Sequence, residues 1–527
     1  MLREAVAMRR RLGRKANSGA AAETASDGHG KVKLAVALYN LAVLLDGQEG
    51  GHDEAATLHR EALAIRQDAL GDHEHTAMSL HCVGLLHHAA GNHADATGDL
   101  ALAASMRRRL GDLCGTASSL HQLSLVHNEL GQHELAVQEC SEALQLRRQE
   151  MGAHTLTATS LCQLAVLLER QGKLEEAEPL YRQALLMRRQ LLHDHPDTAL
   201  AAHNLATVLQ AQGRQRESEP LLREALRIRQ AHLGSSLATV ATMDALGAML
   251  HSTGRSAEAA VLCQEALDKR TSLVGDGHES TATALHNLGL VLHARADHAK
   301  AEVALRRALE IRKEVLGDHA DTAGSLHTLA SVLNTLGRAD EARVLYTEAV
   351  TIRRTVLAPT DPELAATLTN LAVVYHTTRD LESARQHYEE ALQIRQAALG
   401  DHPETAFTSH NYAVLLRDSG CTDEAEAQYR HALGIRTRLS SEHPDVALTL
   451  HDLGVLEYNR GRFQEAEGWF SRAYAIRELT LGDHRYTLTS LTNLAAALAA
   501  QRDKEDEARE RQADAAEMQR RLEPRRG

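Results

Sequence analysis

The sequence predicts an all-α solenoid built from about twelve helical hairpins. A loop tripeptide of Gly, Asp and His recurs along the chain, and adjacent complete or degenerate copies are 40 to 42 residues apart. Between these loops, apolar residues recur at three- and four-residue steps in two successive blocks, which is the spacing of a buried helix face. Proline is rare, at 8 of 527 residues, so long helices can form. The complete tripeptides occupy positions 71–73, 317–319, 400–402 and 482–484.

Residues 157–193 show how one hairpin is expected to form. Leu161, Leu164 and Leu168 fall on one face of a first helix, and residues 171–173 (QGK) supply the turn to a second helix. A single hairpin cannot hide such a face, but stacked copies bury a continuous core. The period of 41–42 residues therefore predicts an ordered array rather than an irregular helical bundle.

The two ends of the chain depart from the repeat. Residues 1–13 match the second helix of a hairpin, and residues 14–30, which are small and contain glycine, are expected to form an enlarged loop. The hairpin array is expected to span residues 31–503. Residues 504–522 are more highly charged and suit a capping helix with a solvated outer face, followed by a tail at 523–527.

Composition and charge narrow the class of protein. The formal net charge is −13, and nucleic-acid binding requires a basic stripe that this chain lacks, so no nucleic-acid partner is expected. No apolar run approaches the roughly 18 residues of a membrane span, so no membrane insertion is expected. The six scattered cysteines indicate reduced thiols, and the N-terminus lacks an apolar signal core. A cytoplasmic protein is expected, with association with the cytoskeleton as a further hypothesis.

Small residues at three positions of each hairpin resemble the tetratricopeptide repeat signature, which places them at the eighth, twentieth and twenty-seventh positions. This resemblance implies a right-handed α-solenoid of tetratricopeptide hairpins. It also implies that the first helix of each hairpin lines a concave groove for peptides or partner proteins. In the hairpin of residues 157–193, the three positions are Ala165, Ala177 and Ala184.

The longer repeat unit narrows the resemblance to one subtype. Residues 176–185 (EAEPLYRQAL) and 400–403 (GDHP) are similar to motifs of the kinesin light chain subtype, and nephrocystin-like arrays are similar as well. The resemblance covers residues 31–500. It implies protein or peptide ligands, with a kinesin heavy chain or a transported cargo as specific candidates.

A ladder of amides on the first helices is one candidate binding feature. The position two residues after the first large residue of each hairpin is Asn in six of twelve hairpins and Gln in two. Asn offers both a donor and an acceptor, so a ladder can satisfy a bound peptide backbone whatever its side chains. The alternative is that each Asn bonds to the neighbouring repeat and fixes the stacking. The predicted ladder contains Asn204, Asn287, Asn370, Asn411 and Asn493.

Aromatic residues point to one region of the array. Twelve of the fourteen aromatic residues follow residue 340, and residues 366–460 are the predicted region of strongest binding. Tyr375, Tyr412 and Tyr458 lie on first helices, away from the aromatic position that the hairpins share, and are predicted site residues together with Arg417. The alternative is that these tyrosines fill ordinary core positions.

Two further residue types recur once per hairpin. The histidines are expected to make semi-buried contacts between repeats, because successive repeats separate them too widely for a metal cluster. The arginines near the end of each second helix are expected to be structural, opposing the negative helix end and pairing with the next loop's Asp. They are His81, His121, His203, His286, His327, His410 and His451, and Arg66, Arg107, Arg147, Arg188, Arg229, Arg270, Arg312, Arg353, Arg395, Arg436 and Arg477.

No catalytic motif stands out from this background. A phosphate-binding GxxxxGK[ST] loop, an HExxH zinc motif and a GxSxG elbow are all absent, so no catalytic residue, metal site or cofactor is expected. The leading hypothesis is a protein-interaction scaffold, in one form a kinesin light chain-like cargo adaptor. The alternatives are a sensor array belonging to a larger NTPase-linked signalling protein and, outside this class, an enzyme with a cryptic site.

Overall fold

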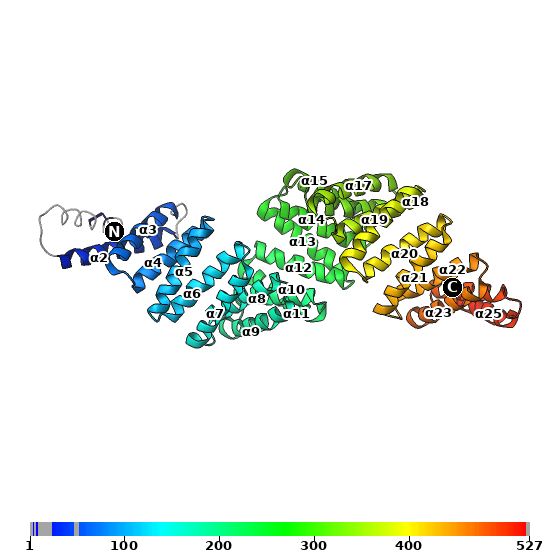
Figure 1. The fold of residues 1–527 in the computed structure, drawn as a ribbon, viewed down its shortest axis with the longest axis horizontal. Helices are drawn as coiled ribbons and strands as arrows, with labels where there is room; N and C mark the ends of the chain where they lie inside the picture. The colour runs from blue at the N-terminus through cyan, green and yellow to red at the C-terminus, as the bar shows by residue number, and fades with distance from the viewer. Residues whose placement is uncertain (1–3, 5–6, 9–23, 47–51, 523–527) are drawn as a thin grey trace. The chain divides into compact units, whose positions relative to one another are not determined.

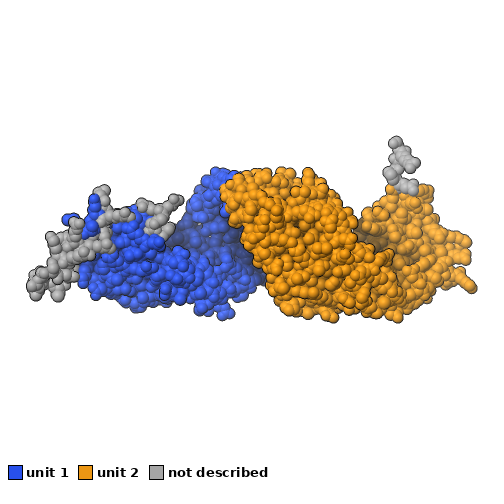
Figure 2. All heavy atoms as spheres, turned by 90° about the horizontal axis from the view of Figure 1, so that it is seen from above, with its two compact units in different colours: residues 1–254 blue, residues 255–527 orange. Residues whose placement is uncertain are grey.

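The computed structural model describes residues 4, 7–8, 24–46 and 52–522. These residues form 24 helices, α2–α25, with no strand among them (Figure 1). The alternating order of first and second helices gives twelve helix pairs, which confirms the predicted all-α repeat array. The chain divides into two compact units, Met1–Gly254 and Arg255–Gly527, which Figure 2 shows in different colours.

Unit 1 contains five complete hairpins and one further first helix. Each helix packs against its neighbours along the chain, and the first helices α4 and α6 also touch. The helices are α2 (Thr24–Asp46), α3 (His52–Leu70), α4 (Glu74–Ala89), α5 (His93–Arg109), α6 (Leu113–Glu129), α7 (His133–Met151), α8 (Thr155–Arg170), α9 (Leu174–Leu192), α10 (Pro196–Ala211), α11 (Gln215–Leu233) and α12 (Leu237–Ser252).

Unit 2 begins with a second helix and continues through six hairpins. Successive first helices touch here too, for example α16 with α18 and α18 with α20. The helices are α13 (Ser256–Val274), α14 (Glu279–Ala294), α15 (His298–Val315), α16 (Ala320–Thr335), α17 (Ala339–Val356), α18 (Pro362–Thr377), α19 (Leu381–Leu399), α20 (Pro403–Asp418), α21 (Thr422–Leu439), α22 (Pro444–Asn459), α23 (Phe463–Leu481), α24 (Arg485–Ala499) and α25 (Glu505–Leu522).

Small and large buried residues alternate through the core. Ala165, Ala177 and Ala184 are completely buried, and so is Tyr181, which packs in the same cluster. The small residues bring α8 and α9 close together, and the large ring fills the space beside them. The same arrangement recurs in unit 2, where Tyr346, Tyr388, Tyr429 and Phe470 are the large buried residues.

The recurring Gly-Asp-His tripeptide has a structural explanation in the loops between hairpins. Gly400 takes a positive φ of 59° directly after α19, a conformation that glycine adopts without steric cost. His402 is then the N-cap of α20, and its Nδ1 accepts a hydrogen bond from the Glu404 backbone N–H at 3.2 Å. This bond satisfies one of the amides that a helix start leaves unpaired. The same cap is made by His73, His154, His195, His278, His319, His443 and His484.

The structure differs from the sequence expectation near the N-terminus. The expected loop at 14–30 is helical from Thr24, because α2 extends through the last seven of those residues. A helix that is already packed along residues 35–45 can extend at low cost, even through the unfavourable glycines at its start. Residues 14–23, the tail at 523–527 and most of the expected helix at 1–13 lie outside the described residues. At the other end, α25 occupies the segment expected to form a charged helix, and it buries Ala508, Ala515 and Met518.

None of the described helices combines the length and the apolar character that crossing a membrane requires. None of the six cysteines, all of which lie among the described residues, forms a disulfide; Cys140, Cys162 and Cys263 are buried and Cys114 is exposed.

Candidate functional site

A buried arginine joins each hairpin to the next one. Arg147, near the end of α7, donates through Nη1 to the Leu156 backbone carbonyl at 3.0 Å and to the Ser160 hydroxyl at 2.7 Å, both on α8. All eleven predicted arginines make the carbonyl contact, and nine also reach a Ser or Thr hydroxyl. These arginines therefore have a structural role, which is to join the end of one hairpin to the first turn of the next helix.

The expected pairing of these arginines with the next loop's Asp is only partly correct. Arg107 does lie 3.8 Å from Asp112, measured from Nε to the carboxylate. The partner that all eleven share, however, is a backbone carbonyl in the first turn of the next helix. A guanidinium carries several donors in a fixed plane, so it can bridge a carbonyl and a hydroxyl one turn apart.

The recurring histidines extend this network to the first helix of the preceding hairpin. The Nδ1 of His327 lies 3.2 Å from the Thr367 hydroxyl, which also receives a hydrogen bond from Arg353. Equivalent contacts join His81 to Ser119, His286 to Ser325 and His451 to Ser490. Burial, reinforced by the nearby arginine, lowers the pKa of His327 to about 4, so this imidazole is neutral at pH 7.

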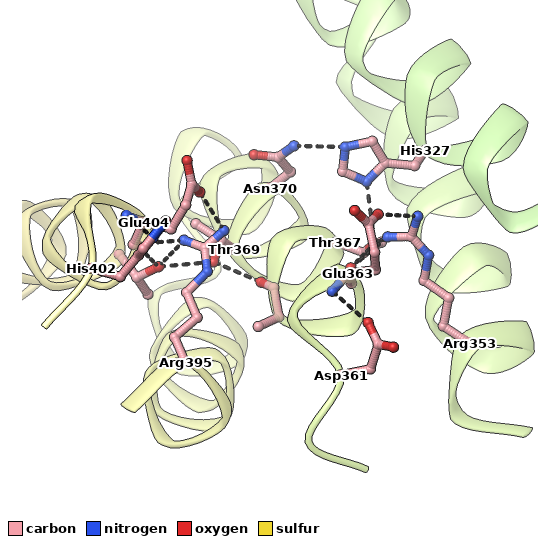
Figure 3. Close-up of polar contacts among 12 residues, drawn as sticks. His327, Arg353, Asp361, Glu363, Thr367, Thr369, Asn370, Arg395, His402 and Glu404 are labelled. Carbon is pink, nitrogen blue, oxygen red and sulfur yellow. Dashed lines mark hydrogen bonds and ion pairs between the residues drawn. The ribbon is translucent and has the colours of Figure 1, made fainter. Parts of the chain in front are cut away.

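Two of the five predicted ladder asparagines are tied into the same network. The Nδ2 of Asn370 lies 3.2 Å from Nε2 of His327, and the Nδ2 of Asn493 lies 3.3 Å from Nε2 of His451 (Figure 3 shows the first pair). Each Asn therefore bonds to the preceding hairpin, as the stacking alternative requires.

The other predicted asparagines differ from this pair. Asn204 on α10 and Asn411 on α20 are half-buried, and their side chains make no hydrogen bond within the described part of the chain. The residue that would correspond to the bonded histidine is Cys162 before Asn204 and Thr369 before Asn411. Neither offers an imidazole nitrogen. Asn287 is half-buried at the equivalent position of α14.

The half-buried side chains at matching positions of α18, α20 and α22 form a surface that we call the ladder face. It combines amides and a carboxylate at one register position, valines at the next, and larger side chains at a third. The ladder face consists of Asn370, Val373, His376, Asn411, Val414, Arg417, Asp452, Val455 and Tyr458.

The three predicted tyrosines lie in three different environments. Tyr412 is only 5% exposed, and its hydroxyl donates to Glu389 at 2.6 Å, so this residue fills a core position. Tyr375 is half-buried and stacks on His387 of its own hairpin, with ring centroids 5.4 Å apart. Tyr458 lies on the ladder face, as does Arg417, whose guanidinium pairs with Asp418 at 3.0 Å.

Two predicted residues meet at a pocket beside the ladder face. Tyr458 and Asn493 line a pocket of about 230 Å³ together with Val455, Asn459, Phe470 and Ala496. Its lining combines aromatic and aliphatic side chains with two amides. Such a site can take one small apolar group of a ligand and hydrogen bond to its edge.

A second hollow lies on the other helices of unit 2. It is an open groove of about 980 Å³ between α13, α14 and α15, and its rim includes Val261 and Val303, which are 70% and 71% exposed. None of the site residues predicted from the sequence lines this groove. The signal available in the sequence was a valine two residues after the small residue in the first turn of each of these second helices, Ala259 in α13 and Ala301 in α15.

These features define an α-solenoid repeat protein whose hairpins are joined by a buried polar network. The tetratricopeptide repeat family matches residues 28–109, 115–190, 163–231, 239–314, 321–397, 363–438, 404–478 and 445–521, and the chain therefore belongs to this family. Tetratricopeptide arrays typically act as scaffolds for protein–protein interaction, and the fold is generally non-catalytic.

Solved structures with a similar fold include kinesin light chain-like repeats. The crystal structure of BtubC (BKLC) from P. vanneervenii is 23% identical, with a TM-score of 0.37 over 44% of this chain and 91% of that one. A putative kinesin light chain with nearly identical repeats, from Podosopora anserina, is 22% identical, with a TM-score of 0.35 over 38% and 96%. The apo form of RapI is 15% identical, with a TM-score of 0.45 over 54% and 99%. A comparison with curated protein sequences finds no match.

Proposed function

We propose that this protein is a peptide-binding scaffold whose ligand lies along the ladder face of α18, α20 and α22. The observation that carries the proposal is the contrast between Asn411 and Asn370. The Asn370 amide is bonded to His327, whereas the half-buried Asn411 amide makes no hydrogen bond within the described residues. Because this amide is not engaged by the described part of the chain, a peptide backbone can supply both a donor and an acceptor for it.

The neighbouring side chains favour an extended peptide with an apolar residue. Val414 on α20 and Val455 on α22, each three residues after the amide or carboxylate position of its helix, supply aliphatic contacts. The pocket beside Tyr458 accepts one small apolar side chain. Arg417 is already paired with Asp418, so recognition would depend on backbone and apolar contacts more than on charge. No catalytic step is part of this proposal.

A kinesin light chain-like adaptor is the specific form of this scaffold that the repeat motifs support. The segments EAEPLYRQAL and GDHP carry that support, and the role would place the protein in the cytoplasm with access to a motor. Direct binding of purified kinesin heavy chain, or its absence, tests this form separately from peptide binding.

The proposal can be tested with peptides selected on the full-length protein. Peptides enriched from a random display library would be synthesised, and their affinities measured by fluorescence anisotropy for the wild type and for Asn411→Ala. Loss of a pair of backbone hydrogen bonds is expected to cost about 1.5 kcal/mol, which raises the Kd about tenfold. Tyr458→Ala should weaken binding as well.

Two control variants separate the ladder face from other surfaces. Gln386→Ala changes an exposed residue of α19 and should leave the Kd unchanged. Val303→Asp alters the groove between α13, α14 and α15. If the selected peptides bind Asn411→Ala normally but lose affinity for Val303→Asp, the ladder face is not the binding site. Equal circular dichroism and melting of the variants would exclude loss of fold.

A further inference from the structure

Three potential metal ligands meet at the turn end of two hairpins in unit 1. His88 lies near the end of α4, His93 is the first residue of α5, and Glu129 is the last residue of α6. The Nε2 of His88 is 2.7 Å from a Glu129 carboxylate oxygen, and Nδ1 of His93 is 3.5 Å from the same oxygen. One nitrogen from each histidine and one carboxylate oxygen all lie within 4.8 Å of one another, and this is the only such group of three in the described residues.

The unsatisfied ring nitrogen of His93 distinguishes this cluster from a surface ion pair. Its Nδ1 is shielded from solvent and has no hydrogen-bond partner within the described residues, although it faces the carboxylate of Glu129. A buried polar atom without a partner costs about 1–3 kcal/mol, and native structures rarely tolerate one without a reason. A cation held between the two imidazoles and the carboxylate would remove that cost.

We propose that His88 Nε2, His93 Nδ1 and a carboxylate oxygen of Glu129 bind one divalent transition-metal ion of the zinc class. Two imidazoles and a carboxylate form a donor set that suits Zn²⁺, Co²⁺ or Ni²⁺, whereas Ca²⁺ and Mg²⁺ prefer oxygen ligands alone. In a tetrahedral zinc site, ligand atoms at about 2.1 Å from the metal lie about 3.4 Å apart, so small side-chain movements suffice. Binding through Nε2 would require the His88 tautomer that carries its proton on Nδ1, so the proton now shared with Glu129 would move to the other ring nitrogen and the imidazole would stay neutral.

The exposure of the three side chains fits a site with open coordination positions. His88 is 19% exposed, His93 32% and Glu129 49%, so water can complete the coordination from the solvent side. The ion would join the first hairpin helix α4, its partner α5 and the next hairpin's α6. Its effect would therefore be to lock the stacking of two consecutive repeats, a role separate from peptide binding.

The chain contains a matched site that lacks one ligand. His293 and His298 occupy the same positions in the α14–α15 hairpin as His88 and His93, and their Nδ1 atoms are 3.1 Å apart. The position of Glu129, two residues before the turn glycine of the next hairpin, is there Thr335, two residues before Gly337. The ligands of the complete site come from two hairpins, so no pattern within one hairpin predicts it.

Zinc binding by the full-length chain, prepared without a histidine tag, tests the proposal. Zn²⁺ is titrated into the protein in the presence of a competing chelator, and the heat of binding is measured by calorimetry. The titration should show one tightly bound ion per chain. Glu129→Gln and His93→Gln should each weaken it at least tenfold, whereas His298→Gln should leave it unchanged. Co²⁺ bound to the wild type should show the visible absorption of a site with few ligands. This absorption should be lost in Glu129→Gln. Melting of each variant in EDTA controls for folding.

Further measurements distinguish Zn²⁺ bound at this specific site from Zn²⁺ bound incidentally to surface histidines. Zn²⁺ should slow hydrogen exchange of the α4–α6 amides, with no such effect in Glu129→Gln. Thr335→Glu should raise the stoichiometry of tight binding from one ion to two. Tight binding that persists unchanged in Glu129→Gln, or the absence of any tight site in the wild type, would overturn the proposal.

Discussion

The side-chain amide of Asn370 lies 3.2 Å from Nε2 of His327, on the first helix of the preceding hairpin. Because the other ring nitrogen of His327 faces Thr367, which receives a hydrogen bond from Arg353, four side chains from three helices form one continuous polar chain. An equivalent chain links Arg477, Ser490, His451 and Asn493. Stacking in this array is therefore specified by buried polar contacts as well as by apolar packing.

The arginine that starts this network should contribute strongly to the stability of the stack. Arg147→Met removes charge-assisted hydrogen bonds to Leu156 O and Ser160 Oγ, and we expect it to reduce the free energy of opening of α7 and α8 by about 2 kcal/mol. Arg148→Met is the matched control, because Arg148 is the adjacent, exposed residue and should change stability by less than about 0.5 kcal/mol. Native-state hydrogen exchange measures both locally, since a repeat array need not unfold in one step. Equal losses in the two variants would contradict a special role for Arg147.

The buried histidines should make the fold sensitive to mild acid. Burial lowers the pKa of His81, His121, His203, His286 and His327 to about 4. An unfolded histidine has a pKa of about 6.5, so between these two values the unfolded chain binds more protons than the folded one. Stability should therefore be independent of these groups above about pH 6.5 and should fall as the pH drops from there toward 4.

Urea midpoints measured between pH 7.5 and 4.5 check this pH dependence. His286→Gln should flatten the slope, because one buried titrating group is removed, while His232→Gln, at an exposed position of α11, should not. If His286→Gln leaves the slope unchanged, this histidine is not the source of the acid sensitivity.

The repeat array could be predicted from the sequence because its signals are local. Helix periodicity, the turn glycines and the 41–42-residue spacing each lie within one hairpin. The start of α2 at Thr24 was missed because composition alone, with Gly28 and Gly30, favoured a loop. The cap function of His402 and its counterparts was also missed, since a histidine cap differs from the usual Ser, Thr, Asp or Asn.

The candidate site was harder to predict because it depends on the register between hairpins. Asn370 and Asn411 have the same position in the repeat, and only the preceding residues His327 and Thr369 decide which amide is bonded. Tyr412 was assigned to the binding surface from its location on a first helix, yet it points into the core and bonds to Glu389. Contacts of this kind involve residues about forty positions apart, which single-hairpin patterns do not specify.

Two hairpin turns should be stabilised by restoring glycine. Arg379 and Ala296 have positive φ angles of 66° and 62° at a turn position where eight other hairpins of the described chain carry glycine. This conformation costs a non-glycine residue about 1 kcal/mol, so Arg379→Gly should raise stability by about 0.5–1 kcal/mol after the entropy of the unfolded glycine is counted. Thr378→Gly is the control, because Thr378 has φ of −86° and should only lose stability. Thermal melting of the two variants should shift in opposite directions.

Some glycines inside the first helices should be required for close packing, so that replacing them with alanine lowers stability. This is expected where the added Cβ would meet the second helix of the same hairpin. A Cβ added at Gly289 would lie 2.5 Å from Cγ of Leu305, an atom close to the α15 backbone that cannot simply swing away. Gly289→Ala should therefore be destabilising by about 1–2 kcal/mol, even though alanine is the better helix former by up to about 1 kcal/mol.

Gly324 in α16 supplies the comparison, since a Cβ there would meet nothing within 4 Å. Gly324→Ala should gain the full helix-propensity benefit of about 0.5–1 kcal/mol. Chemical denaturation of the two variants then measures the same substitution in two settings that differ only in packing. If both variants are stabilised, the close approach of α14 and α15 does not require a glycine at position 289. Opposite signs would show that the small residue at this position of the repeat is selected by the neighbouring helix rather than by local helix formation.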